Sequence, residues 1–141
     1  MQLLKIYYEY FSPGNTTEKV VSHITSSFQN YPVESINLTD YATRQEDYYF
    51  KENELLIIGV PAYGGRVPAP VVDALRHFTG SNTPVVLVAT YGNRDIDDTL
   101  IELKKNVIDK GFIPVGAASF VCQHTFLKEC AEGRPDEEDL K

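Results

Sequence analysis

Residues 3–28 read LLKIYYEYFSPGNTTEKVVSHITSSF, and this stretch decides the fold that the rest of the chain completes. Its first part, Leu3 to Tyr8, is a mostly apolar run of strand length. A turn of small polar residues follows at 11–17. The last part is predicted to be an amphipathic helix, because its apolar residues recur at helical spacing. These residues are Val20, Val21, Ile24 and Phe28.

The turn between this strand and this helix has the composition of a phosphate site. A helix N-terminus exposes unpaired N–H groups and the positive end of the helix dipole, and both attract a phosphate. The candidate phosphate ligands are Ser12, Gly14, Asn15, Thr16 and Thr17. An ordinary structural role is the alternative, in which Ser12 or Thr16 caps the helix and residues 13–15 form a tight turn. The turn has neither the P-loop pattern nor the dinucleotide fingerprint.

Length and composition indicate one domain of 141 residues with a net charge of −7. No apolar run reaches membrane-spanning length and the N-terminus has no signal-peptide pattern, so a cytoplasmic protein that does not bind membranes is expected. The negative charge argues against nucleic-acid binding and suits a basic protein partner, although it also serves solubility alone. Cys122 and Cys130 are expected to be free thiols, because two cysteines make neither a disulfide scaffold nor a four-cysteine metal site.

The remaining chain alternates strands and helices. Strands are predicted at 32–38, at a sheet edge, and at 55–60, 85–89 and 112–121. Apolar stripes predict one helix through Val71, Val72, Leu75 and Phe78 and another through Ile96, Leu100, Leu103 and Val107. Residues 41–50 are read as a short irregular helix, and residues 132–141 as the start of a last helix. The pattern predicts an α/β fold with an open, five-stranded parallel sheet in the order 2-1-3-4-5 and helices on both faces.

Two further turns follow predicted strands, and each contains a tyrosine followed by a glycine. In open α/β sheets ligands bind beyond the carboxyl ends of the strands, so the three turns should meet at one edge. A phosphate turn beside two aromatic loops suits a flat ring with a phosphate tail, since tyrosine stacks well on a ring. A half-buried surface position is the alternative for each tyrosine. The candidates are Pro61, Ala62, Tyr63, Gly64 and Gly65 in one turn, and Thr90, Tyr91, Gly92, Asn93 and Arg94 in the other.

No catalytic acid–base pair and no metal-ligand set stand out in the sequence. Arg66 and Arg94 are read first as solvated surface charges. A receiver domain of the response-regulator type shares the predicted fold, but it needs an aspartate where this chain has Val60 and Pro61.

The turns carry a family resemblance. The segments 10–16, 59–68 and 91–95 resemble the flavodoxins, and most closely the flavodoxin-like domain of bacterial flavodoxin–ferredoxin fusion proteins. Residues 133–136 also look like the segment that leads into the last helix of that domain. The resemblance implies non-covalent flavin mononucleotide (FMN), with its phosphate on residues 12–17 and its ring flanked by Tyr63 and Tyr91. It also implies that Gly64 or Gly65 supplies the peptide that contacts flavin N5.

The chain departs from this family in two places. Gly14 stands where a threonine is usual and Asn15 where a glycine is usual, which removes one hydroxyl ligand, although asparagine tolerates left-handed backbone geometry. The chain also has no ferredoxin part with cysteine-rich iron–sulfur motifs. The missing length is expected to leave the sheet face beside the first helix poorly covered, so that another domain or a dimer could cover it.

The sequence therefore predicts an FMN-binding electron-transfer protein with a redox protein partner such as a ferredoxin or a reductase. The acidic surroundings and the tyrosines predict a low potential for the second one-electron reduction of the flavin. Two alternatives stay open. One is an FMN-dependent reductase of a quinone or another small acceptor, and the other is a binding module that has kept the fold but lost the flavin.

Overall fold

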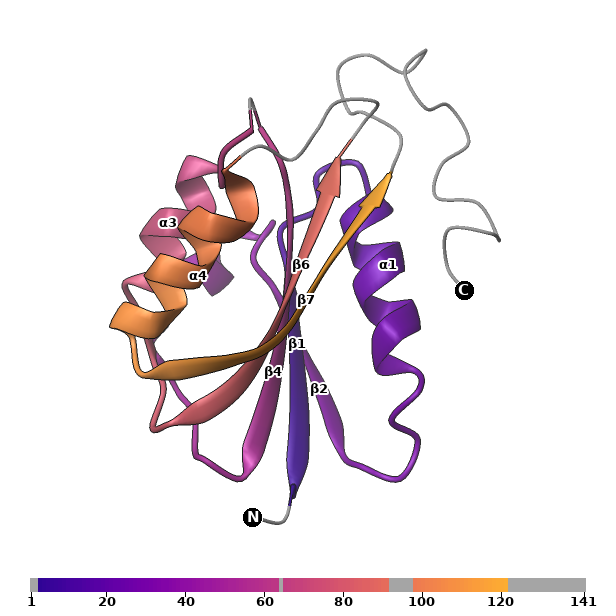
Figure 1. Ribbon diagram of the computed structural model, residues 1–141, viewed down its shortest axis with the longest axis vertical. Coiled ribbons are helices and arrows are strands. Elements are labelled where there is room, and N and C mark those ends of the chain that lie inside the picture. Colours follow the sequence, from indigo (N-terminus) through magenta and orange to yellow (C-terminus); the bar gives the residue numbers. More distant parts are fainter. Residues whose placement is uncertain (1–2, 64, 92–97, 122–141) are drawn as a thin grey trace.

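The computed structural model describes residues 3–63, 65–91 and 98–121. Its main element is a parallel sheet whose strands follow the order β2-β1-β4-β6-β7 (Figure 1). Counted as the sheet's own strands along the chain, this is the predicted order 2-1-3-4-5. The strands are β1 (Lys5–Tyr10), β2 (Val33–Asn37), β4 (Glu54–Pro61), β6 (Thr83–Tyr91) and β7 (Phe112–Val121).

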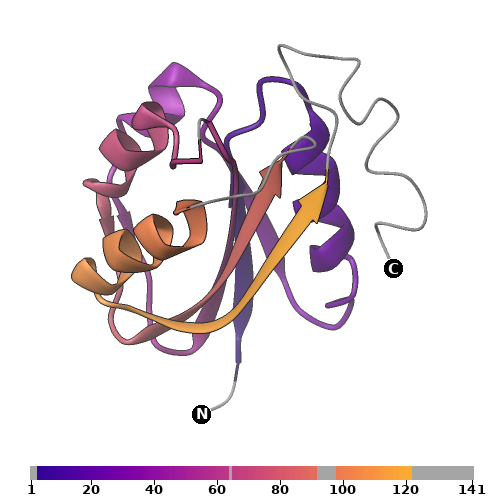
Figure 2. The ribbon, with the colours of Figure 1, turned by 45° about the horizontal axis from the view of Figure 1, so that its top comes forward.

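Helices cover both faces of the sheet, which confirms the predicted α/β class. Figure 2 shows α3 and α4 together on the face opposite α1. The helices are α1 (Thr16–Thr25), α2 (Tyr41–Arg44), α3 (Ala69–Leu75) and α4 (Thr99–Asp109). Among the described residues, α1 is the one helix that covers its face of the sheet.

The apolar runs of the sequence form the central strands, as expected for strands buried on both faces. All of the side chains from Leu55 to Val60 are buried in β4. The face under α3 and α4 holds the larger apolar cluster, which includes Leu56, Ile58 and Leu87. The face under α1 holds a smaller one, which includes Ile6, Val21 and Ile57. Burial of these side chains from water is the main force that assembles the three layers.

Several predicted boundaries are wrong. Phe28 lies beyond the end of α1 at Thr25, where its amide donates to the Thr25 carbonyl oxygen (2.9 Å). Phe78 is not on α3, which ends at Leu75. It forms β5 (Phe78–Thr79), which pairs with β3 (Tyr48–Tyr49) in a second, two-stranded sheet that the sequence did not predict.

This second sheet is held by aromatic packing. The Phe50 and Phe78 rings are stacked with centroids 5.6 Å apart, and Phe50 also contacts Tyr7 edge-on at 5.1 Å. Aromatic pairs of this geometry stabilise packing beyond their buried area. The contacts explain why Phe78 leaves the helical pattern. The predicted features of residues 122–141, including Cys122 and Cys130, lie outside the described residues.

Helix α1 approaches the sheet closely at Gly59 in β4. A Cβ atom added at Gly59 would overlap Val21 Cγ2 and lie 3.1 Å from Thr17 Cγ2. Any larger residue would push the start of α1 away from the strand. The absence of a side chain at Gly59 thus fixes the height of the helix above the sheet.

We expect Gly59→Ala to lower the free energy of unfolding by about 1–3 kcal/mol, because the new methyl group overpacks this contact. Gly116→Ala in β7 is the matched control, since its Cβ would meet Val86 at an ordinary 3.8 Å. Its effect should stay within about 0.5 kcal/mol. Urea unfolding of both variants measures the difference, and equal effects would contradict the close approach.

Glu9 in β1 is a fully buried carboxyl group (0% exposed). Neither of its side-chain oxygens has a hydrogen-bond partner within the described part of the chain. Burial raises the pKa of Glu9 well above its ordinary value. The buried acid is therefore protonated over a wider pH range than an exposed glutamate, since the interior disfavours its charge.

Because Glu9 holds its proton more tightly in the folded protein, it stabilises the fold most at low pH. This contribution is lost as pH rises above the ordinary glutamate pKa of about 4.5. We expect Glu9→Leu to gain stability relative to the wild type as pH rises from 5 to 8, in urea unfolding experiments. The exposed control Glu34→Gln keeps Glu9 and should follow the wild type. A constant difference between Glu9→Leu and the wild type would refute this origin of the pH dependence.

Candidate functional site at the carboxyl edge of the sheet

The carboxyl ends of β1, β4 and β6 lie next to one another. The Phe11 amide donates to the Gly59 carbonyl oxygen (3.2 Å), and the Ala62 amide donates to the Thr90 carbonyl oxygen (2.8 Å). Pro61 pairs with Thr90 in the parallel ladder. The described parts of the three predicted turns therefore meet at one edge, as the topology required.

Three groups of Ser12 form hydrogen bonds that order the first turn: its hydroxyl, its carbonyl oxygen and its amide. Its Oγ accepts from the Glu18 amide of α1 (3.0 Å), and its carbonyl oxygen accepts from the Asn15 amide (3.0 Å). Its own amide donates to Thr39 Oγ1 (2.7 Å), in the segment after β2. The buried Ser12 hydroxyl therefore caps α1, as the structural alternative predicted. Asn15 has the left-handed backbone angle φ 66°, which it tolerates better than most residues.

Three amides at the start of α1 remain available. Within the residues that the structure describes, the amides of Gly14, Thr16 and Thr17 have no hydrogen-bond acceptor. Gly14 is exposed and Thr16 is half-buried, so both are accessible to a ligand. Amides at the positive end of a helix suit a phosphate without any basic side chain. The residues present thus fit the phosphate of FMN, mainly through the backbone.

A buried hydroxyl pair joins this turn to β6. Thr17 Oγ1 and Thr90 Oγ1 lie 2.8 Å apart, and either of them can be the donor. Both side chains are buried. The predicted ligands Thr17 and Thr90 therefore bind each other, and their hydrogen bond ties the start of α1 to β6, the strand that ends in Tyr91.

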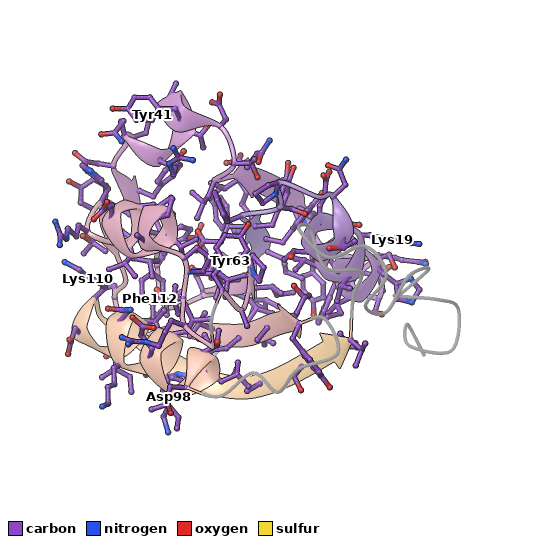
Figure 3. The ribbon with its side chains drawn as sticks, turned by 90° about the horizontal axis from the view of Figure 1, so that it is seen from above. Lys19, Tyr41, Tyr63, Asp98, Lys110 and Phe112 are labelled. Atoms are coloured by element: carbon purple, nitrogen blue, oxygen red, sulfur yellow. The ribbon has the colours of Figure 1, made fainter. Side chains whose placement is uncertain are left out.

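The second predicted turn is a narrow hairpin. Tyr63 and Arg66 exchange two backbone hydrogen bonds, of 2.9 and 3.0 Å. Gly65 is buried with φ 75°, a conformation that glycine adopts without strain. The half-buried Tyr63 ring packs edge-on against Phe11, with centroids 6.2 Å apart. Figure 3 shows Tyr63 near the middle of this edge, with Lys19 on α1 to one side and the start of α4 to the other.

Glu102 of α4 holds this hairpin from outside. Its Oε1 accepts from Arg66 Nε and from the Val67 amide, both at 2.9 Å, and its Oε2 accepts from Arg66 Nη2 at 3.3 Å. The hydrogen bond from Arg66 is the main cause that lowers the pKa of Glu102. The same bond raises the pKa of Arg66. Arg66 is thus exposed, as predicted, but it is tied to a carboxylate.

The third predicted turn needs a correction. Thr90 and Tyr91 are not turn residues but the last residues of β6, where β7 continues the ladder beside them through Phe120 and Val121. Tyr91 is half-buried at the strand end. Gly92, Asn93, Arg94 and Gly64 lie outside the described residues.

Sequence reasoning missed three residues that shape the site, namely Phe11, Thr39 and Glu102. Thr39 follows β2 at the same sheet edge, so the topology alone could have suggested it. Phe11 follows β1 directly and was read only as part of the turn. Glu102 gave no signal, because its contact with Arg66 spans 36 residues.

No protein-family model matches the sequence, and no curated protein matches it either. Solved structures do match its fold. An archaeal flavodoxin has a TM-score of 0.61 and 15% identity, over 91% of this chain and 92% of that one. Two-electron reduced Megasphaera elsdenii flavodoxin has a TM-score of 0.58 and 19% identity, over 96% and 94%.

A Lactobacillus acidophilus flavoprotein in complex with FMN has a TM-score of 0.59 and 16% identity, over 82% of this chain and 93% of that one. The class of the fold follows from these matches and from the strand order. The protein has a flavodoxin-like fold.

Because the Thr17 and Thr90 hydroxyls contact each other, we expect the effects of their mutations on the free energy of unfolding to be non-additive. Thr90→Val should lower the free energy of unfolding by roughly 1–2 kcal/mol, because it leaves the buried Thr17 hydroxyl without this partner. Adding Thr17→Val should cost little more, as expected for two residues that interact directly. Urea unfolding of the two single variants and the double variant measures the coupling.

The control combines Thr17→Val with Thr83→Val. Thr83 is also buried, but its hydroxyl bonds the Lys51 carbonyl oxygen in another part of the sheet. The two effects should add. Strict additivity in the Thr17–Thr90 pair would show that the 2.8 Å contact contributes nothing.

Proposed function

We propose that this protein binds FMN non-covalently at the carboxyl edge of its sheet and transfers electrons to or from a protein partner. The observation that carries the proposal is the first turn. It presents the amides of Gly14, Thr16 and Thr17 at the positive end of α1, on a flavodoxin-like fold. The N-terminus of a helix favours a phosphate, because its free N–H groups and the helix dipole both attract negative charge.

The phosphate ligands are mainly backbone groups. The amides of Gly14, Thr16 and Thr17 donate to the phosphate oxygens, and the Thr16 hydroxyl adds a side-chain donor. Ser12 supports them indirectly, because its hydroxyl orders the first turn of α1. The left-handed Asn15 lets the turn close despite the replaced glycine. This division of roles preserves phosphate binding although one hydroxyl of the usual motif is absent.

The ring lies along the ends of β4 and β6. Pro61 and Ala62 border Thr90 there, and the backbone of Gly65 approaches the ring from the hairpin. Gly64 stays a predicted ring contact outside the described residues. Tyr63 and Tyr91 flank the ring as its aromatic contacts. Gly92, Asn93 and Arg94 stay predicted contacts outside the described residues. Bound FMN supplies the one- and two-electron chemistry. The protein contributes binding, orientation and exclusion of water.

The charge of the chain favours a low potential and a protein partner. Negative charge near a flavin opposes the arrival of a further electron, so the net charge of −7 supports a low potential for the second one-electron reduction. The same charge attracts a basic surface on a ferredoxin or a reductase. No helix among the described residues is long and apolar enough to cross a membrane.

Two other functions are weighed against this one. Reduction of a quinone or another small acceptor would require turnover with NAD(P)H by the isolated protein. A binding module without flavin is favoured if the buried Ser12 and Thr17 hydroxyls, each engaged within the protein, leave the phosphate too weakly held. The absorption spectrum and a turnover assay separate the three.

We expect the purified protein to retain flavin bands after incubation with FMN and desalting. Tyr91→Ala should weaken binding of FMN and riboflavin alike, by roughly tenfold, because it removes a ring contact. Thr16→Val should weaken FMN binding by several-fold and leave riboflavin binding unchanged, because only FMN carries the phosphate. Fluorescence titration measures both affinities.

Tyr49→Ala is the matched control, since Tyr49 is a tyrosine in β3 with 75% exposure and no part in the proposed site. It should bind both flavins like the wild type. A wild-type protein that takes up no flavin at micromolar concentration rules out the proposal and favours the binding module. NAD(P)H-dependent turnover would favour the reductase.

A further inference from the structure

The hairpin from Tyr63 to Val67 is held to α4 by two separate sets of bonds. At its base, Glu102 binds the Arg66 side chain and the Val67 amide. Nearer its tip, the carbonyl oxygen of Gly65 accepts from the Asp98 amide at 3.1 Å, just before α4 begins. We call these contacts of Glu102 and Asp98 the α4 clasp.

The Glu102 carboxylate accepts three hydrogen bonds in the clasp. Both oxygens of Glu102 are used, and the carboxylate and the guanidinium meet through two N–H donors, the geometry that gives arginine–carboxylate pairs their specificity. The Glu102 side chain is only 23% exposed, whereas that of Arg66 is 64% exposed. Val67, whose amide completes the set, is buried in the main core cluster. Through Glu102, the clasp thus joins the buried Val67 and the exposed Arg66 side chain to α4.

The bonds of the clasp are not required to form the hairpin or to bury Val67. The hairpin is already closed by its own Tyr63–Arg66 bonds, and Val67 is already anchored by burial. The bonds from Glu102 and Asp98 instead hold the hairpin, and with it the Gly65 carbonyl and the Tyr63 ring, in place relative to the ends of β4 and β6. These are the groups that border the proposed ring site.

We infer that Glu102 is a positioning residue for the flavin ring: it holds the Tyr63–Val67 hairpin against α4 in the conformation that binds the ring. This inference rests on the proposed FMN site. Glu102 itself does not contact the flavin. Its effect passes through Arg66 and Val67, so it concerns the ring and not the phosphate.

The first measurement needs no flavin. Amide hydrogen exchange of the wild type and Glu102→Ala compares the amides of Arg66, Val67 and Asp98. We expect exchange at Val67 to become at least about tenfold faster in the variant, because a charge-assisted hydrogen bond is lost. Unchanged exchange at all three amides would overturn the clasp itself.

The second measurement titrates FMN and riboflavin. Glu102→Ala should weaken both by the same factor, roughly tenfold, because a ring-binding hairpin that must be ordered on binding lowers affinity for any flavin. Glu102→Gln keeps one acceptor oxygen and should lie between Glu102→Ala and the wild type. Arg66→Gln removes only the side-chain bonds of the clasp and leaves α4 and the bond from the Val67 amide intact. It should therefore weaken the binding of both flavins less than Glu102→Ala does, and it tests the inference if Glu102 variants fold poorly.

Asp73→Asn is the matched control. Asp73 pairs with Arg76 on α3 at 3.7 Å, in an exposed ion pair away from the hairpin. It should change neither exchange nor affinity. Faster exchange in Glu102→Ala with unchanged affinity for both flavins would overturn the positioning role, as would a loss confined to FMN.

The proposed function and this inference fail in different ways. A wild-type protein that binds neither flavin overturns the proposed function, and the positioning role with it, even if the exchange data confirm the clasp. A wild-type protein that binds both flavins, with Glu102→Ala equal to it, overturns the positioning role alone.

Discussion

The structure depends on the close contact between α1 and β4 at Gly59. Without a side chain there, Val21 and Thr17 lie directly on the strand. This contact sets the height of the helix and, with it, the position of the amides at the helix start. Because Thr17 packs its methyl group near Gly59 and its hydroxyl against Thr90, one residue joins the core to the proposed site. Core packing and the proposed phosphate site are therefore linked through the first turn of α1.

Most polar side chains of the candidate site form hydrogen bonds to other groups of the protein. Ser12 caps α1, Thr17 binds Thr90, and Glu102 binds the hairpin at Arg66 and Val67. A hydroxyl or carboxylate that orders the backbone reduces the cost of arranging that backbone around a ligand. At the start of α1, the groups without a partner among the described residues are therefore mainly backbone amides, and the hydroxyls of Ser12 and Thr17 are bonded within the protein. This explains how the replaced residues at Gly14 and Asn15 are compatible with an ordered turn.

The fold was predictable because its signals are local and repeated. The apolar run 55–60 predicted a strand buried on both faces, and it lies inside β4. The stripe through Leu100, Leu103 and Val107 predicted α4. The meeting of the three turns followed from the topology. The errors have a common cause as well. Phe28 and Phe78 fitted a helical stripe by spacing, but packing outside the helices determined where they lie.

The sequence by itself determined the α/β class, the strand order and the edge at which the three predicted turns meet, because hydrophobic periodicity and right-handed crossovers leave few other arrangements. Only the tertiary structure decided how the polar residues of that edge are used. The Thr17–Thr90 pair spans 73 residues and the Arg66–Glu102 pair 36, and the buried Glu9 has no partner among the described residues. Such contacts depend on the distance between a helix and the sheet and on the direction of the chain at the end of a strand. These are properties of packing, and no local pattern in the sequence records them.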